Sequence, residues 1–155
     1  MTKRQPSTHA LAAKAIRAEL KALGIKARVR SDVFAGGDAV RIEANDVHPD
    51  IFDEMKKIVN KYQYGSFDGM TDSYDYDNCN DKLPQVKYVT YCNNLSEVLR
   101  QKAYEYLLVN DPGFPDNMPE KYVDAGRIVH PFWNDSVYVL VNRFLRKPKY
   151  FEKVA

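Results

Sequence analysis

The sequence predicts an α+β fold in which helices cover one face of a small antiparallel sheet, in the order α-β-β-α-β-α-α. Three observations lead to this fold class. Apolar residues recur at helical spacing over residues 8–23, they alternate with polar residues over residues 25–30 and 40–44, and β-forming residues fill residues 86–92. The chain has 155 residues, a length typical of one domain with a sizeable core. We therefore expect residues 1–155 to form a single domain.

Charge and cysteine content narrow the classes of protein to consider. The formal net charge is +2, but residues 1–30 carry eight basic residues against one acidic residue, whereas residues 63–82 carry five aspartates against one lysine. The chain has two cysteines, and it lacks an apolar run suited to a signal peptide or a membrane span. We expect a protein of the host cytoplasm with no membrane partner and no cofactor.

The first helix is predicted over residues 8–23. Ser7 can cap its start, and Gly24 suits the left-handed position after its end. Apolar residues fall on one face of this helix, and Lys14, Arg17 and Lys21 fall on the opposite face. The helix is therefore expected to pack with its apolar face on the sheet and its basic face outward.

Residues 25–45 predict a β-hairpin. Apolar residues alternate with Lys26, Arg28 and Arg30 in its first strand, which is the pattern of a strand buried on one side. A glycine pair within residues 32–38 predicts an extended connection to the second strand. The basic residues of this strand should then point away from the first helix.

The middle of the chain predicts one more helix and one more strand. Pro49 suits a first helical position, and Ile51, Met55, Ile58 and Tyr62 lie at the spacing of a core-facing stripe. Residues 86–92 should form the third strand of the sheet.

Helices are predicted again towards the C-terminus. Asn94 and Glu97 have capping-box spacing ahead of a helix that runs to about Asn110, and a short helical turn is expected over residues 119–125. Residues 137–145 match helical periodicity, although VYVLV is equally compatible with a strand. The sequence does not indicate what residues 86–155 do.

Residues 61–77 are the most distinctive stretch. They contain four tyrosines, four aspartates, Phe67 and Met70, and Gly65 and Gly69 allow sharp reversals of the backbone. This pattern predicts a shaped loop, with Phe67 and Met70 expected to anchor it in the domain.

Aromatic and acidic side chains together are typical of protein-recognition surfaces, and the acidic charge would repel nucleic acid. The predicted binding residues are Tyr64, Phe67, Asp68, Asp72, Tyr74, Asp75, Tyr76 and Asp77. Two other interpretations stay open. The aromatic residues could serve only the packing of the loop, and Asp68 with Asp72 could hold a metal ion or perform acid–base catalysis. We predict no metal site and no catalytic residues.

Nucleic-acid binding is the alternative function. The residues that could contact phosphates are Lys14, Arg17, Lys21, Lys26, Arg28 and Arg30. Their predicted positions divide them between opposite sides of the domain, and residues 25–45 are not expected to supply the aromatic platform that binds single strands.

Cys92 is expected to be a small buried residue at a strand end.

Residues 8–78 resemble the large polyvalent protein-associated domain 29 family of phage and plasmid proteins. The resemblance is carried by the alanine-rich helix THALAAKAIRAELKALG, by VRSDVFAGGD, and by the loop GSFDGMTDSYDY. Residues 86–155 are then expected to be a C-terminal extension packed on this family-like core. The family brings no catalytic residues with it.

The resemblance implies an accessory protein of a phage or plasmid. Together with the aromatic and acidic loop, it leads us to expect a non-catalytic protein that binds a host macromolecule. We favour a host protein as the partner, with action as a counter-defence (anti-CRISPR-like) inhibitor. A nucleic-acid-binding module and an enzyme that uses the aspartate-rich loop are the alternatives. The sequence does not indicate an oligomeric state.

Overall fold

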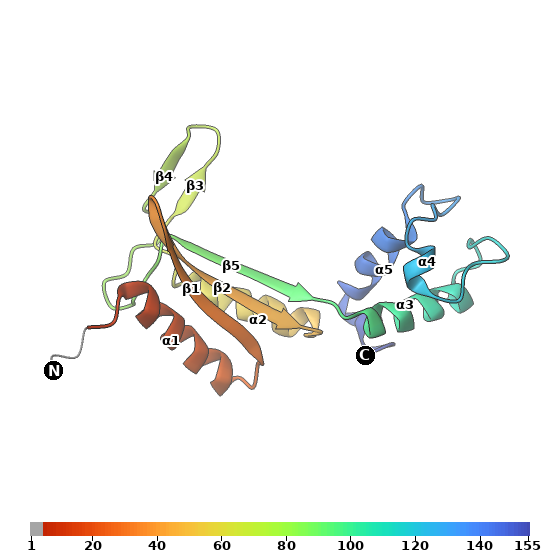
Figure 1. The fold of residues 1–155 in the computed structure, drawn as a ribbon, viewed down its shortest axis with the longest axis horizontal. Helices are drawn as coiled ribbons and strands as arrows, with labels where there is room; N and C mark the ends of the chain where they lie inside the picture. Colours follow the sequence, from red (N-terminus) through yellow and green to blue (C-terminus); the bar gives the residue numbers. More distant parts are fainter. Residues whose placement is uncertain (1–4) are drawn as a thin grey trace. The chain divides into compact units, whose positions relative to one another are not determined.

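A computed structural model describes residues 5–155 (Figure 1). The chain divides into two compact units. The first comprises the residues up to Asn45 together with Ile51–Asn94, and the second comprises Asp46–Asp50 and Leu95–Ala155. The strand predicted over residues 86–92 thus belongs to the first unit. The expectation that the whole chain is a single domain stays a prediction.

The first unit is built on a three-stranded sheet with the order β1-β2-β5. Strands β1 (Ala27–Phe34) and β2 (Gly37–Asn45) are antiparallel, whereas β5 (Tyr88–Asn94) runs parallel to β2. The α+β fold is confirmed, but the expectation of a purely antiparallel sheet was wrong. Helix α2 (Pro49–Asn60) lies between β2 and β5 in the chain, and such a crossover returns the chain in the same direction.

The β1–β2 connection is shorter than predicted. The strands extend to Phe34 and resume at Gly37, so that Ala35 and Gly36 form the whole turn. Gly36 has a φ of 97°, a conformation that glycine adopts without steric penalty. The segment expected to be an extended loop is therefore mostly paired strand.

Helices α1 (Thr8–Ala22) and α2 cover one face of the sheet, as predicted. Val29 and Ile42 are buried on that face. Phe52 of α2 meets Tyr91 of β5 edge-on with ring centroids 6.1 Å apart. Figure 1 shows α1 running alongside β1.

Two details of these helices differ from the prediction. Ser7 is the N-cap of α1, but its hydroxyl pairs with the His9 ring at 2.9 Å rather than with the helix backbone. In α2 the buried stripe runs through Met55 and Val59, whereas Ile51 is 43% exposed. The stripe is rotated relative to the prediction, because residues four apart share a helix face.

A second, two-stranded sheet completes the first unit. Strands β3 (Ser66–Asp68) and β4 (Ser73–Asp75) form an antiparallel hairpin. Figure 1 shows this hairpin standing away from the end of the three-stranded sheet. Most of its residues are exposed.

The second unit is helical, with α3 (Glu97–Asn110), α4 (Tyr122–Ala125), α5 (Val137–Leu145) and α6 (Pro148–Phe151). The helix predicted over residues 137–145 is confirmed. The buried core of the second unit consists of Leu99, Ala103, Tyr104, Tyr122, Ala125, Val137, Val141, Phe144, Leu145, Phe151 and Val154.

The cap of α3 differs from the prediction. Ser96, not Asn94, caps this helix, because its hydroxyl accepts a hydrogen bond from the Leu99 amide at 3.2 Å. Among the described residues, no helix is both long and apolar enough to cross a bilayer.

Candidate functional site

The turn of the β3–β4 hairpin is held by its own side chains. The carboxylate of Asp68 accepts hydrogen bonds from the Met70 amide and the Thr71 hydroxyl, each at 2.8 Å. These bonds lower the pKa of Asp68. Asp72 takes the left-handed conformation with a φ of 51°, which aspartate tolerates better than most residues. The hairpin is therefore a formed structure before any partner binds.

A cluster of tyrosines fixes the base of the hairpin. The Tyr74 ring lies 5.7 Å from the Tyr64 ring and 5.4 Å from the Tyr76 ring, and its hydroxyl donates to the Lys87 carbonyl at 2.6 Å. Burial, followed by nearby ionisable groups, raises the pKa of Tyr74 to about 12. A Cβ at Gly65 would lie 2.0 Å from the Asp75 carbonyl oxygen, so the backbones pass each other in contact there.

The residues predicted for this site differ in their exposure to solvent. Tyr64, Asp68 and Tyr74 are half-buried, and Phe67, Asp72, Asp75, Tyr76 and Asp77 are exposed. The expectation that Phe67 and Met70 anchor the loop was wrong, because Phe67 is 54% exposed and Met70 is 97% exposed. The tyrosines perform that anchoring. The sequence could not show this, because aromatic and apolar residue types are equally compatible with either role.

The aspartates of the hairpin do not converge on one point. Asp68 is engaged with the turn, and Asp77 accepts a hydrogen bond from Ser66 at 2.8 Å. Within residues 5–155, no group of three or more His, Cys, Asp or Glu side chains is placed to hold a metal ion.

The face of the three-stranded sheet that α1 and α2 leave uncovered, which we call the open face, carries basic residues. Arg30 of β1 is directly opposite Arg41 of β2, and Arg28 is opposite Glu43. The three arginines are exposed. Cys92 also lies on this face and is exposed, so the expectation that it is buried was wrong.

Aromatic rings occupy one end of the open face. Phe34 of β1 stacks with Tyr88 of β5 at a centroid distance of 6.0 Å and an interplanar angle of 28°. Tyr88 in turn meets Tyr74 at 5.8 Å, which joins the open face to the base of the hairpin. Residues 25–45 thus contribute one ring, Phe34, to an aromatic pair with Tyr88, which we call the aromatic platform. That residues 25–45 supply no platform for single strands stays a prediction. The platform escaped the sequence analysis because its two rings come from strands far apart in the chain.

A groove at the edge of the sheet collects further basic residues. Its lining includes Arg17 and Lys21 of α1, and Lys26 and Arg28 at the start of β1. Arg17 is held there by a 2.8 Å hydrogen bond to the Val29 carbonyl. The expectation that the helix and the strand present basic groups on opposite sides was therefore wrong for these residues, because β1 is an edge strand that α1 side chains can reach.

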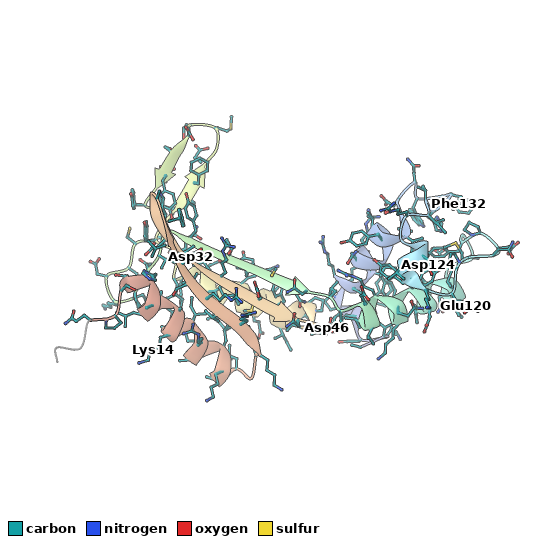
Figure 2. All side chains as sticks on the ribbon, viewed as in Figure 1. Lys14, Asp32, Asp46, Glu120, Asp124 and Phe132 are labelled. Atoms are coloured by element: carbon teal, nitrogen blue, oxygen red, sulfur yellow. The ribbon has the colours of Figure 1, made fainter. Side chains whose placement is uncertain are left out.

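Lys14 is the one predicted nucleic-acid contact outside both the groove lining and the open face. Figure 2 shows Lys14 on α1 and Asp32 on β1.

The second unit contains one buried polar residue, the histidine His130, among the residues that the structure describes. His130 is 1% exposed, and its Nε2 lies 3.5 Å from the Asp111 carboxylate. Its Nδ1 accepts a hydrogen bond from the Phe132 amide at 3.2 Å, and its ring meets Phe114 edge-on. These contacts hold the loop that carries the exposed side chain of Phe132, labelled in Figure 2. No signal in the sequence marks this histidine.

No curated protein and no solved structure matches the chain. A family model described as large polyvalent protein associated domain 29 matches residues 7–97. The match extends beyond the resemblance at residues 8–78, and it includes the described helices and strands of the first unit from α1 to β5. Because it spans more than half of the chain, this phage-associated protein belongs to the large polyvalent protein-associated domain 29 family.

Proposed function

We propose that this protein is a non-catalytic phage accessory protein that binds a host protein through the β3–β4 hairpin. The observation that carries the proposal is the exposure of Phe67 and Met70 on a backbone that is already fixed. Aromatic and methionine side chains are enriched in the cores of protein interfaces. A preformed loop also loses little conformational entropy on binding. The hairpin therefore has apolar groups available to a partner at a small entropic cost.

The charge of the hairpin selects the class of partner. The segment that carries the two apolar side chains also contains four aspartates, namely Asp68, Asp72, Asp75 and Asp77. A complementary surface is basic, and like-charge repulsion disfavours nucleic acid at this position. Basic protein surfaces often serve to bind nucleic acid. Covering such a surface on a host enzyme would block its substrate, which supports action as a counter-defence (anti-CRISPR-like) inhibitor.

The test begins with host proteins retained by the immobilised full-length chain from nuclease-treated lysate. The retained proteins are identified by mass spectrometry, purified and titrated by calorimetry. We expect the double variant Phe67→Ala/Met70→Ala to bind the purified partner at least about 30-fold more weakly, since interface anchors each contribute more than about 1 kcal/mol.

Val109 provides a matched control, because it is an exposed apolar residue (85%) in α3 of the second unit. Val109→Ala should bind the partner with unchanged affinity. Equal binding by the hairpin double variant and the wild-type chain would place recognition elsewhere. Retention that occurs only in a parallel lysate without nuclease would show that nucleic acid mediates the contact.

A further inference from the structure

We propose that the open face of the three-stranded sheet is a second binding site, and that its ligand is single-stranded nucleic acid. This site is distinct from the exposed tip of the hairpin, and it has the opposite charge. The inference does not depend on the hairpin binding a host protein.

The first argument is the pair Arg30 and Arg41. These two arginines are direct neighbours across β1 and β2, and both are exposed. Like charges directly opposite each other destabilise a sheet. Arg41 approaches Asp32 only at 4.0 Å, and Arg30 has no ion-pair partner among residues 5–155. A bound phosphate would relieve the repulsion and accept hydrogen bonds from both guanidinium groups.

The second argument is the continuation of this charge into the edge groove. Arg28 belongs both to the open face and to the groove, where Arg17, Lys21 and Lys26 join it. No carboxylate is among the lining residues of this groove. Along the whole path, Asp32 and Glu43 are outnumbered by the six basic side chains Arg17, Lys21, Lys26, Arg28, Arg30 and Arg41. A chain of phosphates matches such a path better than a single small anion.

The third argument is the aromatic platform at the other end of the path. Phe34 and Tyr88 stack with each other, and Phe34 is 44% exposed, which leaves its ring accessible to a base. Tyr88 is two residues along β5 from Thr90, which pairs with Arg41, and Phe34 is four residues along β1 from Arg30. These spacings correspond to about 7 Å and about 13 Å along the strands. A base can therefore stack at the platform while neighbouring phosphates meet the arginines.

The aromatic platform favours a single strand over a duplex. The bases of a duplex are stacked on each other and expose only their edges in the grooves, whereas unpaired bases can stack on protein rings. Residues 26–34 span about 26 Å as an extended strand, which suits a site of a few nucleotides. An acidic peptide would use the arginines but would have no base for the platform.

Fluorescence anisotropy with the full-length chain and a labelled thymidine oligonucleotide of about 20 nucleotides tests this proposal. The double variant Arg30→Gln/Arg41→Gln should reduce the dependence of log affinity on log salt by about 1.4, because each lost phosphate contact on a single strand contributes about 0.7. The variant Phe34→Leu, which keeps an apolar side chain but removes the ring, should bind at least about 5-fold more weakly.

The control variant Lys14→Gln/Lys57→Gln removes the same charge from residues outside the open face. It should keep both the wild-type affinity and the wild-type salt dependence. The hairpin variant Phe67→Ala/Met70→Ala should also bind the oligonucleotide normally, which separates this test from that of the proposed function. Melting temperatures measured in parallel confirm that each variant is folded.

Four outcomes would overturn the proposal. The first is no oligonucleotide binding at about 50 mM salt, where electrostatic contacts are strong, and the second is an affinity for a duplex of the same length that equals the affinity for the single strand. The third is poly-glutamate that competes for the protein as well as an unlabelled oligonucleotide does. The fourth is an arginine double variant that binds like the lysine control. Equal competition by poly-glutamate would assign the face to an acidic protein instead.

Discussion

The β3–β4 hairpin and the open face share an aromatic cluster, yet they use their charged residues differently. In the hairpin, Asp68 and Asp77 accept hydrogen bonds from neighbouring hairpin residues. On the open face, Arg30 and Arg41 oppose each other across two strands. The acidic groups therefore stabilise the hairpin to which they belong, whereas the repulsion between the two arginines destabilises the sheet.

This difference indicates where stability and binding can be separated. Substitutions at the base of the hairpin should change the free energy of unfolding, because its contacts maintain the fold. Substitutions in the pair Arg30 and Arg41 should change binding while leaving the sheet as stable as before, or more so. The four predictions below test this division, beginning with the largest expected effect.

Tyr74→Ala should lower the free energy of unfolding by about 2 to 4 kcal/mol, as large-to-small substitutions at packed sites do. The ring of Tyr74 contacts three other tyrosines, and its hydroxyl bonds the Lys87 carbonyl. Tyr74→Phe keeps the ring and should lose only about 1 kcal/mol, the net contribution of one hydrogen bond. Urea denaturation measures both variants. Equal losses would mean that the ring packing contributes nothing.

Gly65→Ala should lower the free energy of unfolding by about 1 to 3 kcal/mol, because overpacking displaces neighbouring groups. The added Cβ would meet the Asp75 carbonyl oxygen at 2.0 Å. Gly69→Ala is the matched control within the same hairpin, where the Cβ would meet only the Phe67 ring at 3.9 Å. That variant should stay within about 0.5 kcal/mol of the wild type. A similar loss in both variants would contradict the close approach at Gly65.

Local periodicity predicted the elements of the first unit better than their pairing. The amphipathic pattern of residues 8–23 predicted the bounds of α1 closely, and Pro49 predicted the start of α2. The parallel pairing of β5 was missed because strand direction depends on the path of the chain between strands, not on the pattern inside a strand. The crossover through α2 was a signal that could have indicated it.

The candidate surfaces were only partly predictable for the same reason. Residues 61–77 stood out because their composition is local. The open face depends on register, which places Arg30 beside Arg41 and brings Phe34 to Tyr88. Exposure within the loop was also hidden, because a short hairpin that stands off from the sheet leaves Met70 without a core to enter.

Arg30→Gln should raise the free energy of unfolding by about 0.2 to 1 kcal/mol, because it removes a like-charge neighbour from Arg41. The same variant should weaken oligonucleotide binding. Arg28→Gln is the control, since Arg28 is opposite Glu43 and its loss removes a favourable pair. Urea denaturation at low ionic strength, where charge effects are least screened, compares the two. A destabilised Arg30→Gln variant would show that the arginine pair supports the sheet.

Met70→Ala should have the smallest effect, with the free energy of unfolding within about 0.5 kcal/mol of the wild type. Met70 is 97% exposed, so its side chain has almost no packing to lose, and its amide keeps the hydrogen bond to Asp68. The proposed function requires this result, because a side chain that the fold does not use is free to enter a partner. Chemical denaturation again gives the measurement, with the purified partner added in a second series. A loss above about 1 kcal/mol without partner would place Met70 in a packed environment, as the sequence suggested. The hairpin would then be a structural element, and the proposal of a protein-binding tip would lose its main support.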